Sequence, residues 1–239
     1  MRDDAKPYFD KYADKYRDLH AHNIKSSGED PDYFAAYKVR FIKDYVTRSG
    51  RENPSRFMDF GCGVGGTIGH LVDHFPHTKL HGFDVSGESI ALARETHPKV
   101  QFSVIEGDCL PEGGGPFDMA LAACVYHHIQ PAQRALWTKQ VFNRLKPGGL
   151  FFIFEHNPLN PLTLKAVREC PFDDDAILLP KRESVHLMRE AGFQDVRVDF
   201  IVFFPRMLAW MRPLERLMTK IPIGAQYAVI GHKPLDADA

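Results

Sequence analysis

The chain has 239 residues, of which 44% are hydrophobic and 26% charged, a balance typical of globular proteins that excludes extended disorder. Its 30 basic and 31 acidic side chains give a formal net charge of −1, so no overall positive field favours nucleic acid. The four cysteines form no C-x-x-C pair, which indicates reduced thiols and no zinc site of common spacing. No apolar run is long enough for a transmembrane helix and no signal peptide is evident, so we expect a cytoplasmic protein.

The first fifty residues are rich in aromatic and charged side chains and differ in pattern from the rest. Aromatic residues spaced three and four apart predict one helix around Tyr8–Tyr16 and a second over residues 32–47. We interpret residues 1–50 as a helical cap and residues 51–239 as the main domain.

From residue 56, short apolar runs alternate with amphipathic stretches. The pattern predicts strands at 56–60, 79–84, 100–105, 117–123 and 150–155, and helices at 67–75, 86–96 and 132–145. A buried strand followed by an amphipathic helix is expected over 200–218. Alternation of this kind predicts a doubly wound α/β fold with a parallel sheet, which binds ligands at the carboxyl ends of its strands.

The first predicted strand leads into a glycine-rich loop, Asp59-Phe60-Gly61-Cys62-Gly63-Val64-Gly65-Gly66. Glycines allow a sharp turn and let a ligand approach the backbone, but nicotinamide-dependent enzymes share this pattern. The second strand ends at Asp84, whose carboxylate can accept hydrogen bonds from ribose hydroxyls or cap the next helix. Together, the loop and this acid indicate a ribose-containing cofactor.

Two further acids separate the possible cofactors. Asp59 precedes the glycines, where its charge would repel a pyrophosphate and attract an ammonium group. Asp108 follows the third strand and can accept a hydrogen bond from an adenine amino group. A cationic nucleoside without phosphates, such as S-adenosylmethionine, fits this acidic lining better than a nicotinamide dinucleotide does.

The motifs above occur in the order and spacing of a known enzyme family. Three more stretches belong to the same set: Phe117-Asp118, His127-His128 and Leu145-Lys146-Pro147-Gly148-Gly149. The chain resembles the class I S-adenosylmethionine-dependent methyltransferases, in the small-molecule branch of the ubiquinone/menaquinone methyltransferase-like enzymes (methyltransferase types 11 and 12). The resemblance covers residues 56–155. It implies a Rossmann-like sheet of seven strands in the order 3-2-1-4-5-7-6, with the last strand antiparallel, for which Gln226–His232 is suitable.

The resemblance also implies a set of cofactor-binding residues. Asp59 would lie near the methionine amino group, Asp84 at the ribose hydroxyls, and Asp108 at the adenine edge. The full set is Asp59, Gly61, Cys62, Gly63, Asp84, Val85, Asp108, Cys109, Cys124 and, from the N-terminal lid, Tyr16, with Tyr8 or Tyr12 as alternatives to Tyr16.

Four titratable residues at the carboxyl ends of strands are candidate general bases: His127, His128, Glu155 and His156. The two adjacent histidines could also line the pocket without acid–base work, and the Glu155-His156 segment could be a turn held by Asn157 and Pro158. A metal site is not expected, because adjacent side chains point in different directions and no partner follows at ligand spacing. By the same resemblance, the insert at about 158–182 is the expected acceptor-binding element.

The expected function is methyl transfer from S-adenosylmethionine to oxygen, carbon or nitrogen of a small organic acceptor. The apolar stretch over 200–218 favours a hydrophobic acceptor, and a monomer or homodimer is expected. Two alternatives stay open at this point: a nicotinamide-dependent oxidoreductase, and a non-catalytic relative that binds the nucleoside.

Overall fold

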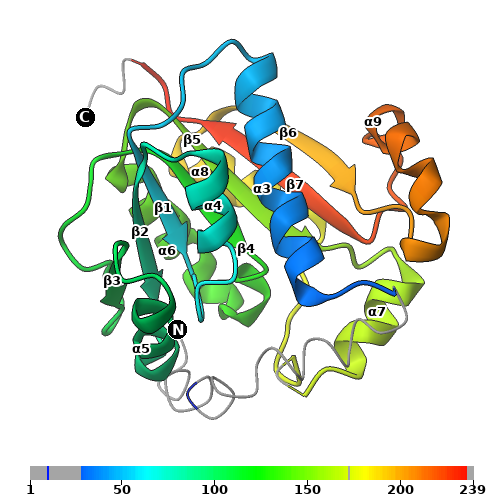
Figure 1. Ribbon diagram of the computed structural model, residues 1–239, viewed down its shortest axis with the longest axis horizontal. Coiled ribbons are helices and arrows are strands. Elements are labelled where there is room, and N and C mark those ends of the chain that lie inside the picture. Colours follow the sequence, from blue (N-terminus) through cyan, green and yellow to red (C-terminus); the bar gives the residue numbers. More distant parts are fainter. Residues whose placement is uncertain (1–9, 11–27, 172, 236–239) are drawn as a thin grey trace.

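The computed structural model describes residue 10 and residues 28–171 and 173–235, and its centre is a seven-stranded sheet (Figure 1). The strands lie in the order β3-β2-β1-β4-β5-β7-β6. Their bounds are β1 Arg56–Phe60, β2 Lys79–Asp84, β3 Gln101–Val104, β4 Phe117–Ala123, β5 Leu145–His156, β6 Gln194–Ile201 and β7 Gln226–His232. The last strand, β7, pairs antiparallel with both β5 and β6, so the predicted order and direction are confirmed.

Helices cover both faces of this sheet. They are α3 Pro31–Arg48, α4 Ile68–His74, α5 Gly87–Thr96, α6 Pro131–Arg144, α7 Pro161–Arg168, α8 Lys181–Ala191 and α9 Glu215–Met218, with short 3-10 helices η3 Tyr126–His128 and η4 Arg206–Leu214. Figure 1 shows α3 and α4 in front of the sheet, with α6 and α8 behind it. Each group packs into its own hydrophobic cluster, so the strands between them are buried on both faces.

Helix α3 belongs to the packed core. Asp30 caps its first turn, accepting a hydrogen bond from the amide of Tyr33 at 2.8 Å. Val39, Ile42 and Val46 face the sheet and are fully buried or nearly so. The helix predicted over 32–47 is thereby confirmed. The boundary at residue 50 between cap and main domain stays a prediction.

Strand β5 begins earlier than predicted. The Lys146-Pro147-Gly148-Gly149 breaker was expected to separate a helix from a strand at 150, but β5 already starts at Leu145. Leu145 pairs with Phe117 and Leu150 with Met119, so the breaker forms an irregularity inside the strand. Gly148 accommodates it with a φ of +75°, a conformation that favours glycine.

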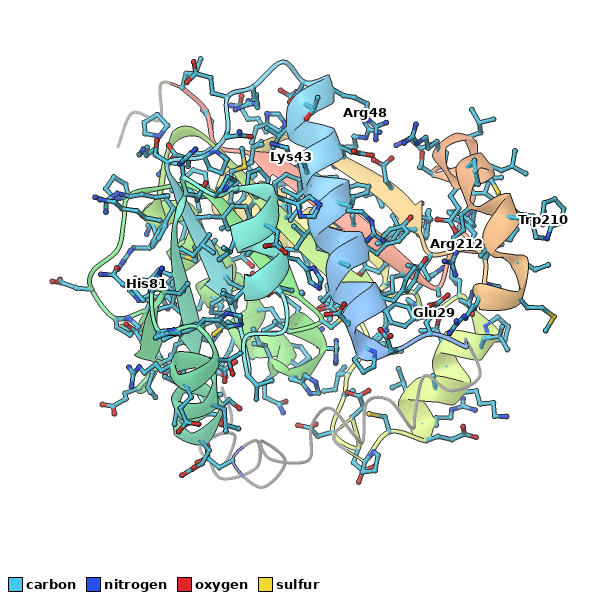
Figure 2. The ribbon with its side chains drawn as sticks, in the orientation of Figure 1. Glu29, Lys43, Arg48, His81, Trp210 and Arg212 are labelled. Carbon is cyan, nitrogen blue, oxygen red and sulfur yellow. The ribbon has the colours of Figure 1, made fainter. Side chains whose placement is uncertain are left out.

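The connection between β6 and β7 differs from the predicted strand and amphipathic helix over 200–218. The strand ends at Ile201, and the rest is the irregular η4 and the short α9, because Pro213 interrupts the helix. The side chains of η4 are exposed or half-buried, and Trp210 points outward (Figure 2). We call residues 202–225 the β6–β7 excursion. No helix in the described part of the chain is long and apolar enough to cross a bilayer.

Polar contacts hold this excursion against α3. Arg212 forms an ion pair with Glu29 just before α3, and the two side chains meet in Figure 2. Tyr37 of α3 donates a hydrogen bond to Glu215 at 2.8 Å. The other carboxylate oxygen of Glu215 accepts from the amides of Phe203 and Phe204 at 3.0 and 3.1 Å. Glu215 therefore links both ends of the excursion's helical part to α3.

Candidate functional site

The glycine-rich loop is tied to the neighbouring strand β2. The amides of Gly61 and Cys62 both donate to the carbonyl of Phe83, at 2.7 and 3.0 Å. Gly61 has a φ of +75°, and a Cβ there would lie 2.7 Å from Cγ1 of Val125 and closer still to its Cγ2. Gly61 is thus required for close packing of the loop against the segment that follows β4.

Asp84, at the carboxyl end of β2, is held by the same loop. Its Oδ2 accepts from the amide of Gly63 at 2.7 Å, and its Oδ1 accepts from the amide of Ser86 at 2.9 Å. Each carboxylate oxygen keeps a further lone pair, so the fixed group can still accept hydroxyl donors. Gly63 differs from Gly61, because a Cβ there would meet no atom within 4 Å. The loop therefore leaves open space next to an oriented carboxylate.

Asp59 is the second acid of this loop and is buried. Its carboxylate accepts a short hydrogen bond from the hydroxyl of Thr67. Burial, together with the negative charge of Asp84, raises the pKa of Asp59 to about 7, and burial also raises the pKa of Asp84. No basic side chain in the described part of the chain forms an ion pair with either acid. A cationic ligand fits such a pair, because it would stabilise both ionised carboxylates.

The other predicted cofactor residues lie at the carboxyl ends of β2, β3 and β4. Val85 is buried, and Asp108 and Cys109 lie on an exposed turn where Gln133 donates to the Asp108 carboxylate at 3.3 Å. The side chain of Cys62 points into the core and leaves only its backbone on the loop. Tyr8, Tyr12 and Tyr16 lie outside the described residues.

A second group of polar side chains gathers where β4 and β5 end. Cys124 follows β4 with a φ of +59°, and its amide donates to the carbonyl of Phe154 at 2.8 Å. The turn leads directly into η3, which carries His127 and His128. Glu155 and His156 complete β5 beside them. All four candidate bases predicted from the sequence therefore come together.

His127 and Glu155 form a buried pair at the centre of this group. Nδ1 of His127 lies 2.6 Å from Oε2 of Glu155, and Oε1 of Glu155 accepts from the amide of Tyr126 at 2.8 Å. The His127 ring also lies beside that of His156, with centroids 5.0 Å apart. Both oxygens of Glu155 are thus engaged by groups of η3, which favours a positioning role for this residue.

The charges in this group are set by competition between burial and neighbours. Burial alone would lower the pKa of His127, but the carboxylates of Glu155 and Asp173 outweigh it and the pKa lies well above its usual value. Burial would raise the pKa of Glu155, yet the His127 charge leaves it lowered. Burial and the His127 charge lower the pKa of His156 to about 4. At neutral pH, His127 is charged and His156 is neutral.

Three residues of these sites were missed by the sequence analysis. Thr67 has no motif of its own, although its hydroxyl holds Asp59. Asp173 comes from the insert, with Oδ1 3.6 Å from Nε2 of His127 and 3.4 Å from Nε2 of His128. Lys38 of α3 is buried. Burial raises the pKa of Cys124 and the Lys38 charge opposes that rise, whereas the same charge adds to the lowering of the His156 pKa by burial and by His127. The sequence offered one sign of a special role for Lys38, namely a charged residue on the apolar face of the helix predicted over 32–47.

Comparison with known proteins agrees with this geometry. Residues 58–151 match the family model of a methyltransferase domain. The trans-aconitate 2-methyltransferase of Azoarcus sp. is 25% identical over 164 residues, which cover 68% of this chain and 63% of the relative. The demethylmenaquinone methyltransferase of Chlorobaculum parvum is 26% identical over 165 residues, covering 69% of this chain and 65% of the relative. The chain thus spans less than two thirds of either relative's length.

These matches support the resemblance of residues 58–151 to the class I S-adenosylmethionine-dependent methyltransferases. The fold agrees with that of the plantazolicin methyltransferase BpumL, solved with a monoazolic desmethylPZN analogue and SAH. The TM-score is 0.67 at 16% identity, and the match covers 96% of this chain and 94% of that one. The methyltransferase match supports S-adenosylmethionine in place of a nicotinamide dinucleotide, while the placement of this cofactor beside Asp59 and Asp84 stays a prediction.

Proposed function

We propose that this methyltransferase domain moves a methyl group from S-adenosylmethionine to a small organic acceptor, at oxygen, carbon or nitrogen. The observation that carries the proposal is the oriented carboxylate of Asp84 beside the open face of Gly63. When bound, S-adenosylmethionine supplies a methyl group already activated by its positive sulfur. The residues of the chain then need mainly to position the reactants and exclude water.

On the cofactor side, we assign Asp84 to the ribose hydroxyls and Asp59 to the methionine ammonium. Asp84 suits its role because both oxygens are fixed by backbone amides and keep free lone pairs. Asp59 suits its role because a buried carboxylate with a raised pKa gains most from a nearby positive charge. Val85, Asp108 and Cys109 are proposed to border the adenine, and Cys124 the methionine side.

On the acceptor side, His156 is the candidate we favour for contact with the acceptor. It is half-buried and, with a pKa lowered to about 4, neutral at pH 7, so its ring can accept a hydrogen bond from an acceptor hydroxyl or amine. The charged His127–Glu155 pair holds η3 in place beside it. A hydrophobic acceptor, a cytoplasmic location and a monomer or homodimer stay proposals from the sequence.

Calorimetric titration with S-adenosylmethionine and with its demethylated product tests the cofactor assignment. Asp84→Ala removes hydrogen bonds to a charged acceptor, each worth about 1.5–3 kcal/mol, so affinity should fall at least about tenfold. Asp73→Ala on α4 is a matched control, because this acid is exposed and distant from the loop's hydrogen bonds. Equal affinity of wild type and Asp84→Ala would remove Asp84 from the ribose role.

Turnover of S-adenosylmethionine labelled in its methyl group, measured against a panel of hydroxylated, amine and carboxylate acceptors, tests the activity itself. Appearance of label in any acceptor supports methyl transfer. Tight cofactor binding with no transfer to the panel would favour the alternative of a non-catalytic nucleoside-binding relative.

A further inference from the structure

The insert brings a third potential ligand to the two adjacent histidines. Asp173 lies 45 positions after His128 along the chain, yet its Oδ1 faces Nε2 of both His127 and His128. One ligand atom from each of the three residues lies within 4.8 Å of the others. The 3-10 turn of η3 is the reason, since it places the two histidine rings with centroids only 4.1 Å apart.

A carboxylate faces the Nδ1 side of each histidine ring, but only that of Glu155 is hydrogen-bonded to its ring, the ring of His127. Nδ1 of His127 lies 2.6 Å from Glu155, and Nδ1 of His128 lies 3.4 Å from Oδ1 of Asp175. Binding of a metal ion would release the proton on Nε2 of His127, and the hydrogen bond to Glu155 would keep the other proton on Nδ1, so that Nε2 offers its lone pair to the ion. Histidines that bind metal ions in proteins are usually supported in this way.

The separations between Asp173 and each histidine match those between two ligands of one metal ion. For a tetrahedral ion with bonds of about 2.0–2.1 Å to nitrogen or oxygen, neighbouring ligand atoms lie about 3.3–3.4 Å apart. The two Nε2–Oδ1 distances of 3.4 and 3.6 Å are close to that value and longer than a usual charge-assisted hydrogen bond. The three side chains are also largely shielded, with exposed fractions of 1%, 13% and 7% for His127, His128 and Asp173.

We propose that His127, His128 and Asp173 form a binding site for one divalent transition-metal ion of the Zn²⁺ type. Two imidazoles and one carboxylate are a donor set suited to Zn²⁺ and other divalent ions of the first transition row, and less suited to Mg²⁺ or Ca²⁺. Three protein ligands leave a fourth position for water or for a polar group of another molecule. The site joins the insert to the ends of β4 and β5. The sequence analysis did not expect a metal site, because it assumed that the two histidine side chains diverge and that no third ligand lies near them. The structure differs on both points.

The test uses the full chain after removal of any affinity tag and dialysis against a chelator. Titration with Co²⁺, followed by visible absorption and by competition with Zn²⁺, should reveal one strong site per chain. Asp173→Asn and His128→Gln should abolish that site. Asp174→Asn and His186→Gln are matched controls of the same residue types at exposed positions, and both should keep the site.

Replacement of Asp175, which lies beside His128, tests the affinity of the site for Zn²⁺. Asp175→Asn should leave one site per chain but weaken Zn²⁺ about 10- to 100-fold, as loss of an outer carboxylate does elsewhere. Circular dichroism and S-adenosylmethionine affinity, measured on the same metal-free samples, check folding and cofactor binding separately, so failure of the metal site is distinguishable from failure of the proposed function.

Two results would overturn the proposal: wild type that takes up less than one equivalent of Co²⁺ or Zn²⁺, or an Asp173→Asn variant that binds either ion as wild type does. If the ligand variants do not fold, nuclear magnetic resonance of the wild-type histidine rings decides. Zn²⁺ should shift the ring signals of His127 and His128 and leave that of His186 in place. Unchanged signals for the first two rings would likewise count against the site.

Discussion

Gly61 and Gly63 stand two residues apart in one loop, but the structure predicts different consequences for the same substitution. Both have positive φ, +75° and +51°, so alanine at either position costs about 1–2 kcal/mol of backbone strain. Only at Gly61 does a new Cβ collide with Val125, at 2.7 Å from Cγ1. Overpacking of this kind costs about 1–3 kcal/mol more. Gly61→Ala should therefore reduce the free energy of unfolding by about 2–5 kcal/mol and Gly63→Ala by about 1–2 kcal/mol.

Urea unfolding followed by circular dichroism measures this difference, provided the slope with denaturant is the same in all variants. A double-mutant cycle with Val125→Ala isolates the collision, because it removes both γ carbons that the new Cβ would meet. The double variant should recover most of the extra loss at Gly61 and none at Gly63. Equal losses for the two single variants, or no recovery with Val125→Ala, would refute the reasoning. Gly63→Ala should instead weaken S-adenosylmethionine binding, since its Cβ enters the open space.

Three further predictions concern charge. Because the folded-state pKa of Asp59 is raised to about 7 from an ordinary value of about 3.9, the folded state holds its proton more tightly, so wild-type stability should fall as pH rises between those values. Asp59→Asn should remove that part of the pH dependence of urea unfolding, and an unaltered profile would contradict the raised pKa. Glu155→Gln leaves the buried His127 without its closest carboxylate, so we expect a lower His127 pKa and a loss of about 3–5 kcal/mol of stability at pH 7. Histidine-resolved magnetic resonance and urea unfolding check both effects, with a stable variant and an unmoved His127 titration as the contrary outcome. Lys38→Met removes a positive charge that lowers the pKa of His156, so His156 should titrate at higher pH; the same titration curve in both proteins would place Lys38 too far away to act.

The parallel part of the fold was predictable because its signals are local. The strands ending at Phe60, Asp84 and Ala123 have the predicted bounds at both ends, since each is an apolar run closed by glycine or polar residues. The helix predicted over 86–96 is present as α5, and Ser86 caps its first turn by accepting a hydrogen bond from the Ser89 amide at 3.0 Å. Patterns of this kind depend on residues that are close together in the sequence, so they can be recognised without a structure.

The group of polar side chains where β4 and β5 end was predictable only in part, because it depends on contacts between distant segments. The four candidate bases come together because they lie at or just after the carboxyl ends of two neighbouring parallel strands, β4 and β5. Asp173, however, reaches them from an insert with no regular sequence pattern. Similarly, β5 begins at Leu145 because pairing with Phe117 outweighs the local breaker. The exposed η4 was mistaken for part of an amphipathic helix, since apolar residues such as Trp210 normally indicate burial but here face outward.

The β6–β7 excursion contributes little to the buried core and nothing to the pairing of the sheet strands. Its helical part adds only Glu215 to the buried residues, while the strands on either side of it keep their pairing through β7 itself. Insertions or deletions within η4 would therefore leave the hydrogen-bond ladder of the sheet intact. Through Glu215 and Tyr37, however, the same segment touches the helix that carries Lys38 toward the strand ends. A change in the length of η4 should therefore leave the sheet intact and still alter the surroundings of the site through α3.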